Sequence, residues 1–507
     1  MKKTCFNALS GIAAGLLGLF LAAPPARAER VPPRLLVVIS VDQMRGDYLE
    51  RFRGEFTGGF KRLLEEGAWF SDAHHAHVPT ETAPGHAVIM SGRYPSQMGI
   101  VGNKWFNPST GKITENIDDS VFGKGPENFL RYNLADALKA KNGKSKVVAL
   151  SLKDRGAILM GGKKADLALW YEKSDGKFRT SSYYAPKTPE WVEKFNAQFL
   201  KVPTDQKAKD YFQSLILDPY GDQLLADLAQ KAVKEYDLGS DADTDILTVS
   251  FSVMDYVGHS FGPDGPEMKK EILALDLALA DLLSFLESRV GKERFYLALT
   301  ADHGVLPLVE ELQKQGIPGA RRVGVMEFAG VLEDEMQKLW PLPQGSKEKW
   351  ILSLDMPNLY LNRAMAGKLN LDWGDFLMKT AALAKSQPAI EEAYTSLDLL
   401  LGRLPGNPYA AAYARSFLPA VSGDILLQPK QYVYLSDYPK GTSHGSPYPY
   451  DTHVPLFFWG PGIANKTFKD RALVADLAPT LGVLLGVDYP PAKGSRVLEE
   501  ALPPAAP

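Results

Sequence analysis

The sequence predicts an α/β fold with a mainly parallel central sheet flanked by helices. Short, continuous apolar runs rich in β-branched residues recur along the chain, which is typical of strands buried on both faces of a parallel sheet. Amphipathic helical patterns separate these runs. Alternating strands and helices place a chain in the α/β class.

The predicted elements follow one another from the N-terminal to the C-terminal part of the chain. The first strand, LLVVISV, covers 35–41, and four later runs repeat its pattern at 146–151, 245–252, 295–300 and 454–459. Helical patterns cover 59–66, 267–289 and 474–485. The first of these patterns is terminated by Gly67, and Pro479 falls near the first turn of the last one.

The remaining stretches divide the chain into parts. We expect residues 29–305 and 435–500 to form the α/β core, with insertions around the site within about 105–237, where loop signals such as KSDGKFRTSSYY occur. Residues 306–434 interleave strand-like pieces (WILSLD, LYLNR, GDILLQP, YVYLS) with helices, which predicts a smaller inserted α+β subdomain. Residues 501–507 are expected to form a flexible tail.

Residues 1–28 have the pattern of a secretory signal peptide. Two lysines precede an apolar run at 8–23, and Ala26-Arg27-Ala28 fits the small-residue cleavage pattern. The alternative is an uncleaved membrane anchor, which the proline pair at 24–25 disfavours. We therefore expect cleavage after Ala28 and a periplasmic or secreted protein. The rest of the sequence has no second apolar run long enough to span a bilayer.

The composition excludes several kinds of chemistry. Cleavage would remove Cys5, the only cysteine, so we expect neither a cysteine nucleophile nor a thiolate metal site. Cleavage would also remove three of the 57 basic residues and none of the 60 acidic ones, which leaves a formal net charge of −6. An acidic chain without basic runs argues against nucleic acid as a standing partner.

The histidines point to a metal centre. All eight lie in five short stretches that also supply acids or hydroxyls: 74–86 (HHAHVPTETAPGH), 255–259 (DYVGH), 302–303 (DH), 444 and 453. Imidazole is the usual nitrogen ligand of zinc, and carboxylates fill the remaining positions in hydrolytic metal sites.

Several of these candidates follow the ends of predicted strands. Because ligands bind beyond the carboxyl ends of the strands in such sheets, we expect five side chains to converge there: Asp42, Lys153, Asp255, Asp302 and His303. Asp255 and His259 are four apart and would share one face of a helical turn, although alone they could equally be a helix cap and a structural histidine.

Together with VDQMR at 41–45 and PTETAPGH at 79–86, these stretches resemble the alkaline phosphatase superfamily. The strongest likeness is to its phosphate-irrepressible, PafA-type bacterial members, which use a threonine nucleophile. The shared words run in order along the mature chain: VDQMR, GGFKRLLEEG, VPTETAPGH, MGIVGNKWF, SLKDRGA, DYVGHSFGP, ADHG, KGTSHGS, YDTHVPLFFWG and ADLAPTL.

The resemblance implies two Zn²⁺ ions and assigns their ligands. One ion would be held by Asp255, His259 and His444. The other would be held by Asp42, Asp302, His303 and Thr82. Mixed His/Asp ligation favours zinc over magnesium or calcium, and two ions about 4 Å apart can bind both the attacking and the leaving oxygen of an in-line displacement.

The resemblance also assigns the nucleophile. The family places it directly before an Ala-Pro-Gly turn, which selects Thr82; Thr80, two residues earlier, is the alternative. We expect the remaining histidines to pack or to form hydrogen bonds around the site: His74, His75, His77, His86 and His453. Spacing alone does not separate His444 from His453 as a ligand.

Three more residues bear on the substrate. Lys153 and Arg155 in SLKDRGA and Asn103 in VGNKW match residues that the monoesterases use, and cationic donors suit the extra charged oxygen of a phosphate monoester dianion. Taken alone, Lys153 and Arg155 could belong to an ordinary solvated surface turn.

The expected function is hydrolysis of small-molecule phosphate monoesters through a phosphothreonine intermediate at alkaline pH. The main alternative is a phosphodiesterase or nucleotide pyrophosphatase with the same zinc centre. A secreted phosphate- or metal-binding protein without catalysis is a further alternative. A sulfatase is disfavoured, because sulfatases need a modified Cys or Ser in a C/S-x-P-x-R context. A monomer is consistent with the sequence.

Overall fold

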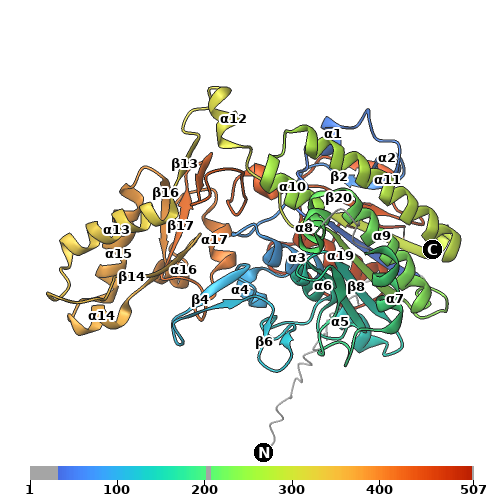
Figure 1. The fold of residues 1–507 in the computed structure, drawn as a ribbon, viewed down its shortest axis with the longest axis horizontal. Coiled ribbons are helices and arrows are strands. Elements are labelled where there is room, and N and C mark those ends of the chain that lie inside the picture. Colours follow the sequence, from blue (N-terminus) through green and yellow to red (C-terminus); the bar gives the residue numbers. More distant parts are fainter. Residues whose placement is uncertain (1–31, 201–206, 505–507) are drawn as a thin grey trace, which may run out of the picture.

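The structure is a computed structural model that describes residues 32–200 and 207–504. The chain forms a larger lobe around a nine-stranded sheet and a smaller lobe beside it (Figure 1). The signal peptide predicted at 1–28 and the end of the predicted tail lie outside the described residues. Across the described ranges, no helix is both long and apolar enough to cross a membrane.

The large sheet has the strand order β10-β9-β8-β11-β1-β12-β20-β2-β21. Every residue of β1 (Leu35–Val41) is buried, as expected for a strand covered on both faces. Its parallel neighbours are β11 (Asp245–Phe251) and β12 (Phe295–Thr300). The parallel pairing continues through β8 (Val147–Ser151) and β9 (Leu167–Glu172). The predicted α/β fold with a mainly parallel sheet is confirmed.

Both ends of the sheet include antiparallel strands. β20 (Leu456–Trp459) runs antiparallel to β12 and to β2 (Ala68–Phe70), and β10 (Lys177–Arg179) runs antiparallel to β9. β21 (Lys466–Phe468) pairs with β2 in parallel. The strand predicted at 454–459 exists, but it runs opposite to its neighbour β12. The sequence could not predict this direction, because an apolar run buried on both faces has the same composition whichever way it runs.

The helices of the larger lobe pack in two groups. α2 (Gly59–Glu66), α9 (Tyr220–Glu235) and α10 (Val253–Phe261) pack around α11 (Pro266–Arg289). α5 (Leu134–Lys141), α6 (Asp154–Gly161) and α19 (Leu477–Leu484) pack around α3 (Thr82–Ser91). Pro479 lies in the first turn of α19. Backbone N–H groups in the first turn make no hydrogen bond within the helix, so the missing N–H of proline costs nothing there.

A carboxylate on α11 caps the start of α2, which has no side-chain cap of its own. Asp276 is buried and accepts the backbone N–H groups of Thr57, Gly58 and Phe60 at 2.8, 2.7 and 2.7 Å. The two helices approach so closely that a Cβ at Gly58 would lie 2.3 Å from the carbonyl oxygen of Asp276. Asp276 therefore satisfies donors that a helix N-terminus otherwise leaves unpaired.

We expect Asp276→Ala to lower the free energy of unfolding by about 3 kcal/mol, because buried N–H groups are left without an acceptor. The measurement is the midpoint of urea unfolding. Asp281→Ala, at an exposed position on the same helix, is the matched control and should change the midpoint little. Equal shifts in the two variants would contradict the capping role.

The smaller lobe has its own antiparallel sheet and its own core. The strand order is β14-β15-β17-β16, and helices pack against it around buried residues such as Phe328, Trp350 and Phe376. Its main elements are α13 (Val325–Leu339), β14 (Ile351–Asp355), β15 (Asn358–Leu361), α14 (Arg363–Lys368), α15 (Trp373–Ser386), β16 (Ile390–Thr395) and β17 (Ile425–Pro429). β13 (Arg321–Val323) and β18 (Val433–Leu435) pair in parallel near the two points where the chain joins the larger lobe. We propose 306–434 as the extent of this inserted subdomain.

The remaining elements are short. They are α1 (Tyr48–Arg51), β3 (Ala73–His74), α4 (Pro95–Met98), β4 (Lys104–Asn107), β5 (Lys112–Glu115), β6 (Asp118–Asp119), β7 (Gly123–Lys124), α7 (Glu190–Phe199), α8 (Ala208–Ser214), α12 (Val309–Lys314), α16 (Ser396–Leu401), α17 (Ala410–Ser416), α18 (Pro449–Thr452), β19 (His453–Val454) and β22 (Ala472–Leu473).

Candidate active site

Four parallel strands of the large sheet end at one edge. Ser40 of β1 is level with Ser250 of β11 and Thr300 of β12, and Ser250 is level with Ser151 of β8. The strands therefore end side by side. The polar residues that follow them come together at this edge: Asp42, Lys153, Asp255, Asp302 and His303.

Asp255, His259 and His444 form one group of possible metal ligands. Asp255 and His259 lie one turn apart on α10, and the Nε2 atoms of His259 and His444 are 3.2 and 3.8 Å from Asp255 Oδ1. Each ring donates its Nδ1–H to a backbone carbonyl at 2.7 Å, His259 to Thr442 and His444 to Thr80. Metal-binding histidines are typically held in this way, with the other ring nitrogen left for the ion.

Asp42, Asp302 and His303 form a second, adjoining group. His303 Nε2 lies 3.6 Å from Asp42 Oδ1 and 3.4 Å from Asp302 Oδ2, and its Nδ1–H is donated to the Gly304 carbonyl at 2.9 Å. Burial lowers the pKa of His303 and that of His444, so both rings stay neutral and keep a lone pair for an ion.

The two groups fit a pair of metal ions. His303 Nε2 and Asp42 Oδ1 are buried and have no hydrogen-bond partner among the described residues. Burial raises the pKa of Asp42, and the nearby carboxylates of Asp255 and Asp302 raise it further, because like charges oppose one another. Bound cations would relieve this repulsion, and the imidazole and carboxylate donors suit zinc.

Thr82 is the first residue of α3, and its side chain is buried beside the two groups. Its Oγ1 lies 3.4 Å from Lys153 Nζ, and the start of a ten-residue helix favours negative charge there. The Thr80 hydroxyl, by contrast, donates to the Ser446 carbonyl at 2.9 Å. Of the two threonines, Thr82 is the one whose hydroxyl faces the charged side chains.

The Ala-Pro-Gly segment after Thr82 allows α3 to approach the second group. A Cβ at Gly85 would lie 2.3 Å from the carbonyl oxygen of Asp302. Glycine at this position therefore lets the first turn of α3 lie directly against the loop that holds Asp302 and His303.

Lys153 connects the two groups. It is 3 % exposed, and its Nζ lies 2.7 Å from Asp42 Oδ2 and 2.5 Å from Asp255 Oδ2. Burial alone would lower the pKa of Lys153, but these carboxylates hold it above its ordinary value, so the ammonium stays charged. A solvated surface turn does not describe this residue.

Arg155 and Asn103 complete the polar surroundings of Thr82. Arg155, on the first turn of α6, is partly exposed, and Asp154 beside it keeps the pKa of the guanidinium high against the effect of desolvation. Asn103 Oδ1 accepts the N–H of Ala83 at 2.9 Å, and its backbone N–H is donated to Glu81 Oε2 at 2.7 Å. The Asn103 carboxamide is thus fixed next to Thr82.

Comparison with known proteins identifies the family. The family model described as "Type I phosphodiesterase / nucleotide pyrophosphatase" matches residues 36–322, which is more than half of the chain. The chain belongs to this family.

Within it, the similarity is to PafA-type alkaline phosphatases. Alkaline phosphatase PafA of Elizabethkingia meningoseptica is 31% identical, over 96% of this chain and 98% of PafA. Alkaline phosphatase PhoV of Synechococcus elongatus is 30% identical, over 93% of each chain. The crystal structure of wild-type PafA superposes with a TM-score of 0.85, covering 93% of this chain and 99% of that one. A second PafA structure is of a form substituted at a threonine, an asparagine, a lysine and an arginine.

Two other histidines, His86 and His75, form hydrogen bonds to residues next to the proposed metal ligands of this PafA-type chain. His86 Nδ1 lies 2.8 Å from the Thr82 carbonyl and 3.2 Å from Asp302 Oδ2, and its Nε2 lies 2.7 Å from Ser250 Oγ. His75 Nε2 donates to the Ala301 carbonyl at 2.9 Å, next to Asp302. Both rings are therefore used to hold the backbone around the proposed ligands.

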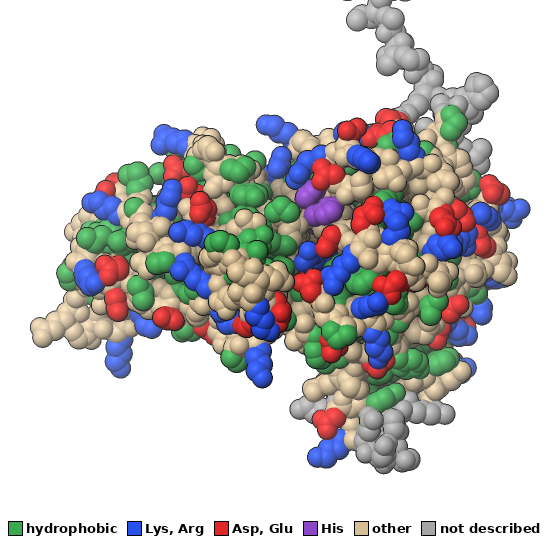
Figure 2. Space-filling view, turned by 90° about the horizontal axis from the view of Figure 1, so that it is seen from above, with side chains coloured by type: hydrophobic (Ala, Val, Ile, Leu, Met, Phe, Trp, Pro, Cys, Tyr) green, Lys and Arg blue, Asp and Glu red, His purple; other side chains and the backbone are tan. Residues whose placement is uncertain are grey.

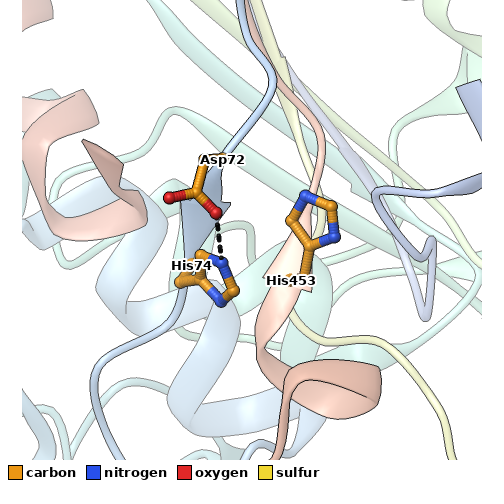
Figure 3. Close-up of side chains that lie close together, drawn as sticks. All are labelled: Asp72, His74 and His453. Carbon is orange, nitrogen blue, oxygen red and sulfur yellow. Dashed lines mark hydrogen bonds and ion pairs between the residues drawn. The ribbon is translucent and has the colours of Figure 1, made fainter. Parts of the chain in front are cut away.

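His74 and His453 form a separate group with Asp72 in the sheet β19-β3-β22 (Figure 3). His74 contacts Asp72 Oδ1 at 2.9 Å and Thr452 Oγ1 at 3.0 Å, and its ring stacks on that of His453. His453 Nε2 donates to the Ser71 carbonyl at 2.9 Å. The hydrogen bond and the stacking contact of the His453 ring are therefore made to Ser71 and His74 and not to the proposed metal ligands.

Gln43 is a residue of the site that the sequence alone did not single out. Its side-chain amide donates to Asp255 Oδ1 at 2.7 Å, and its backbone N–H donates to Asp302 Oδ1 at 3.0 Å. It thereby ties together one carboxylate from each group, and its backbone has the left-handed φ of 69°. The only feature of the sequence that could have pointed to Gln43 is its position in VDQMR, directly after Asp42.

We expect Gln43→Ala to weaken zinc binding by roughly ten- to a hundredfold, because the Asp255 carboxylate loses the amide donor that orients it, while the backbone N–H to Asp302 remains. Competition with a chelator of known affinity measures the change. Gln198→Ala, at an exposed position on α7, is the control. Unchanged zinc affinity in Gln43→Ala would show that Asp255 holds its position without the amide of Gln43.

Proposed function

We propose that the chain is an exported two-zinc alkaline phosphatase that hydrolyses small-molecule phosphate monoesters through a phosphothreonine at Thr82. One zinc would be bound by Asp255, His259 and His444. The other would be bound by Asp42, Asp302, His303 and Thr82. The observation that carries the proposal is the meeting of two Asp/His groups at the buried hydroxyl of Thr82, with Lys153 in contact with all three.

The chemistry follows from these side chains. When bound, zinc would lower the pKa of the Thr82 hydroxyl and supply positive charge to the reacting oxygens. Thr82 Oγ1 loses its proton to solvent and attacks phosphorus, the bond from phosphorus to the alcohol oxygen breaks, and the departing alcohol oxygen takes a proton from solvent. Lys153, Arg155 and Asn103 bind the non-bridging oxygens. Water then cleaves the phosphothreonine and releases inorganic phosphate, which restores Thr82.

The relatives support this assignment. Those reported above are named alkaline phosphatases. The substituted form of PafA was altered at four residue types that also occur here as Thr82, Asn103, Lys153 and Arg155, and the spacing within the Thr–Asn pair and within the Lys–Arg pair is the same. The proposal of export rests on the sequence of residues 1–28. The choice of zinc rests on the mixture of imidazole and carboxylate ligands.

A phosphodiesterase is the second candidate, because the family model carries that description. The buried Lys153 and the partly exposed Arg155 beside it favour the monoesterase, since a diester has a substituent where a monoester has its extra charged oxygen. Catalytic efficiencies on an aryl phosphate and on the matched aryl methyl phosphate diester decide between them. A preference for the diester would overturn the proposal.

Removal of metal is expected to abolish turnover, and zinc is expected to restore it while magnesium alone does not. The measurement is the rate of aryl phosphate hydrolysis against metal content, at alkaline pH, where loss of the Thr82 proton is favoured. Full activity of a metal-free preparation would contradict the two-zinc centre.

A further inference from the structure

A cavity opens beside the site, where the two lobes meet. Its volume is about 530 Å³, and its wall on the larger lobe includes Glu81 and His444. The opposite wall comes from the smaller lobe, including the end of β14 and the strand β18. Figure 2 shows histidine side chains at the surface where the lobes adjoin, with hydrophobic and charged side chains around them. The cavity therefore adjoins the site through His444, a proposed zinc ligand, and through Glu81, the residue directly before Thr82.

The cavity is rich in carboxylates. Glu81, Asp355 and Asp437 line it, and Lys104 is the lysine among its lining residues. The Asp355 carboxylate forms no hydrogen bond or ion pair with any residue of the described ranges, although the charge of Lys104 acts on it. Glu81 and Asp355 line the same space, and like charges that face one space oppose each other. A positive charge between them would be stabilised.

Its other lining is apolar and aromatic. Met326 and Tyr438 line the cavity and are 73% and 75% exposed, although large apolar side chains are usually covered. Met356 and Tyr434 line the same space. Thioether groups and tyrosine rings bind apolar bodies, and tyrosine faces also attract cations.

The position of the cavity relative to Thr82 suggests what binds there. Lys153 and Arg155 would hold the phosphate oxygens, and the alcohol must leave on the side opposite the attacking Oγ1. That side is the ligand group that does not include Thr82, and His444 of this group lines the cavity. We propose that the cavity binds the leaving alcohol and selects monoesters whose alcohol has an apolar body with a positively charged ammonium group. Alcohols that carry a further negative charge are disfavoured, because several carboxylates and a single lysine line the cavity. This inference rests on the monoesterase function proposed above.

The test uses three aryl phosphates of matched leaving-group acidity whose para substituent ends in a trimethylammonium, a hydroxyl or a sulfonate. We expect kcat/KM to fall in that order, by roughly tenfold from cation to anion, as expected for one or two partly screened charge interactions. Asp355→Asn should reduce the cation-to-anion ratio by roughly threefold, and Lys104→Ala should increase it. Asp334→Asn, exposed on α13, is the matched control and should leave the ratio unchanged.

A second measurement separates this inference from the proposed function. The phosphate-free trimethylammonium phenol should bind the zinc-loaded enzyme more tightly than its hydroxyl analogue, and Asp355→Asn should remove that difference in calorimetry. If the monoesters are not hydrolysed but this binding pattern holds, the cavity assignment stands and the phosphatase assignment fails. Equal rates for the three esters, or equal binding of the two phenols, would overturn the cavity assignment.

Discussion

Replacing Thr82 with alanine is expected to lower turnover of a phosphate monoester by roughly a thousandfold or more while zinc remains bound. The substitution removes the oxygen that attacks phosphorus. The six other proposed ligands keep their positions, because their hydrogen bonds do not involve the Thr82 side chain: Asp42, Asp255, His259, Asp302, His303 and His444. Steady-state rates and zinc content of the same preparation measure both parts of the expectation.

Thr80→Ala is the matched control. The Thr80 hydroxyl donates to a backbone carbonyl, whereas the contact that holds His444 uses the Thr80 carbonyl, which alanine keeps. We expect a modest loss for Thr80→Ala and partial activity for Thr82→Ser, which retains a hydroxyl. If Thr80→Ala is inactive and Thr82→Ala turns over normally, the nucleophile has been assigned to the wrong threonine.

Lys153→Ala and Arg155→Ala are each expected to lower monoester kcat/KM by roughly ten- to a thousandfold, the scale of one lost charge-assisted contact in the transition state. Diester hydrolysis should change much less, because a diester lacks the extra charged oxygen. The ratio of the two activities is therefore the measurement, and we expect it to fall in both variants.

The structure adds a second expectation for Lys153. Its ammonium lies between Asp42 and Asp255, so Lys153→Ala also changes the charge around both metal groups, whereas Arg155→Ala does not remove such a contact. Zinc content must be measured alongside the rates. Lys144→Ala, at an exposed position before β8, is the control. Equal losses on both substrates at full zinc content would show that these cations do not discriminate monoesters.

Much of the fold and of the candidate site could be predicted because the signals are local. A continuous apolar run such as 35–41 specifies a buried strand, and an acid directly after it is placed at the sheet edge by the geometry of parallel strands. Asp255 and His259 needed only the helical repeat. The ligand sets themselves came from the resemblance, and their roles remain proposals.

The rest depends on contacts between distant segments, which no local pattern encodes. The direction of β20 follows from the path of the chain through the smaller lobe. His444 is oriented by the backbone of Thr80, and Gln43 acts through carboxylates more than two hundred residues away. Composition also could not show that Lys153 lies between two acids, because the same Lys-Asp-Arg triplet suits an exposed turn.

The insertion of the smaller lobe between β12 and β20 sets the order in which the site can be completed. Six of the proposed ligands lie in the chain before this lobe, and His444 comes after it. A chain that emerges N-terminus first can therefore assemble the second group while the first still lacks one imidazole. Completion of the first group requires the segment that follows the smaller lobe, because that segment supplies His444. Chains that end before His444 would hold at most one complete ligand set and should remain inactive.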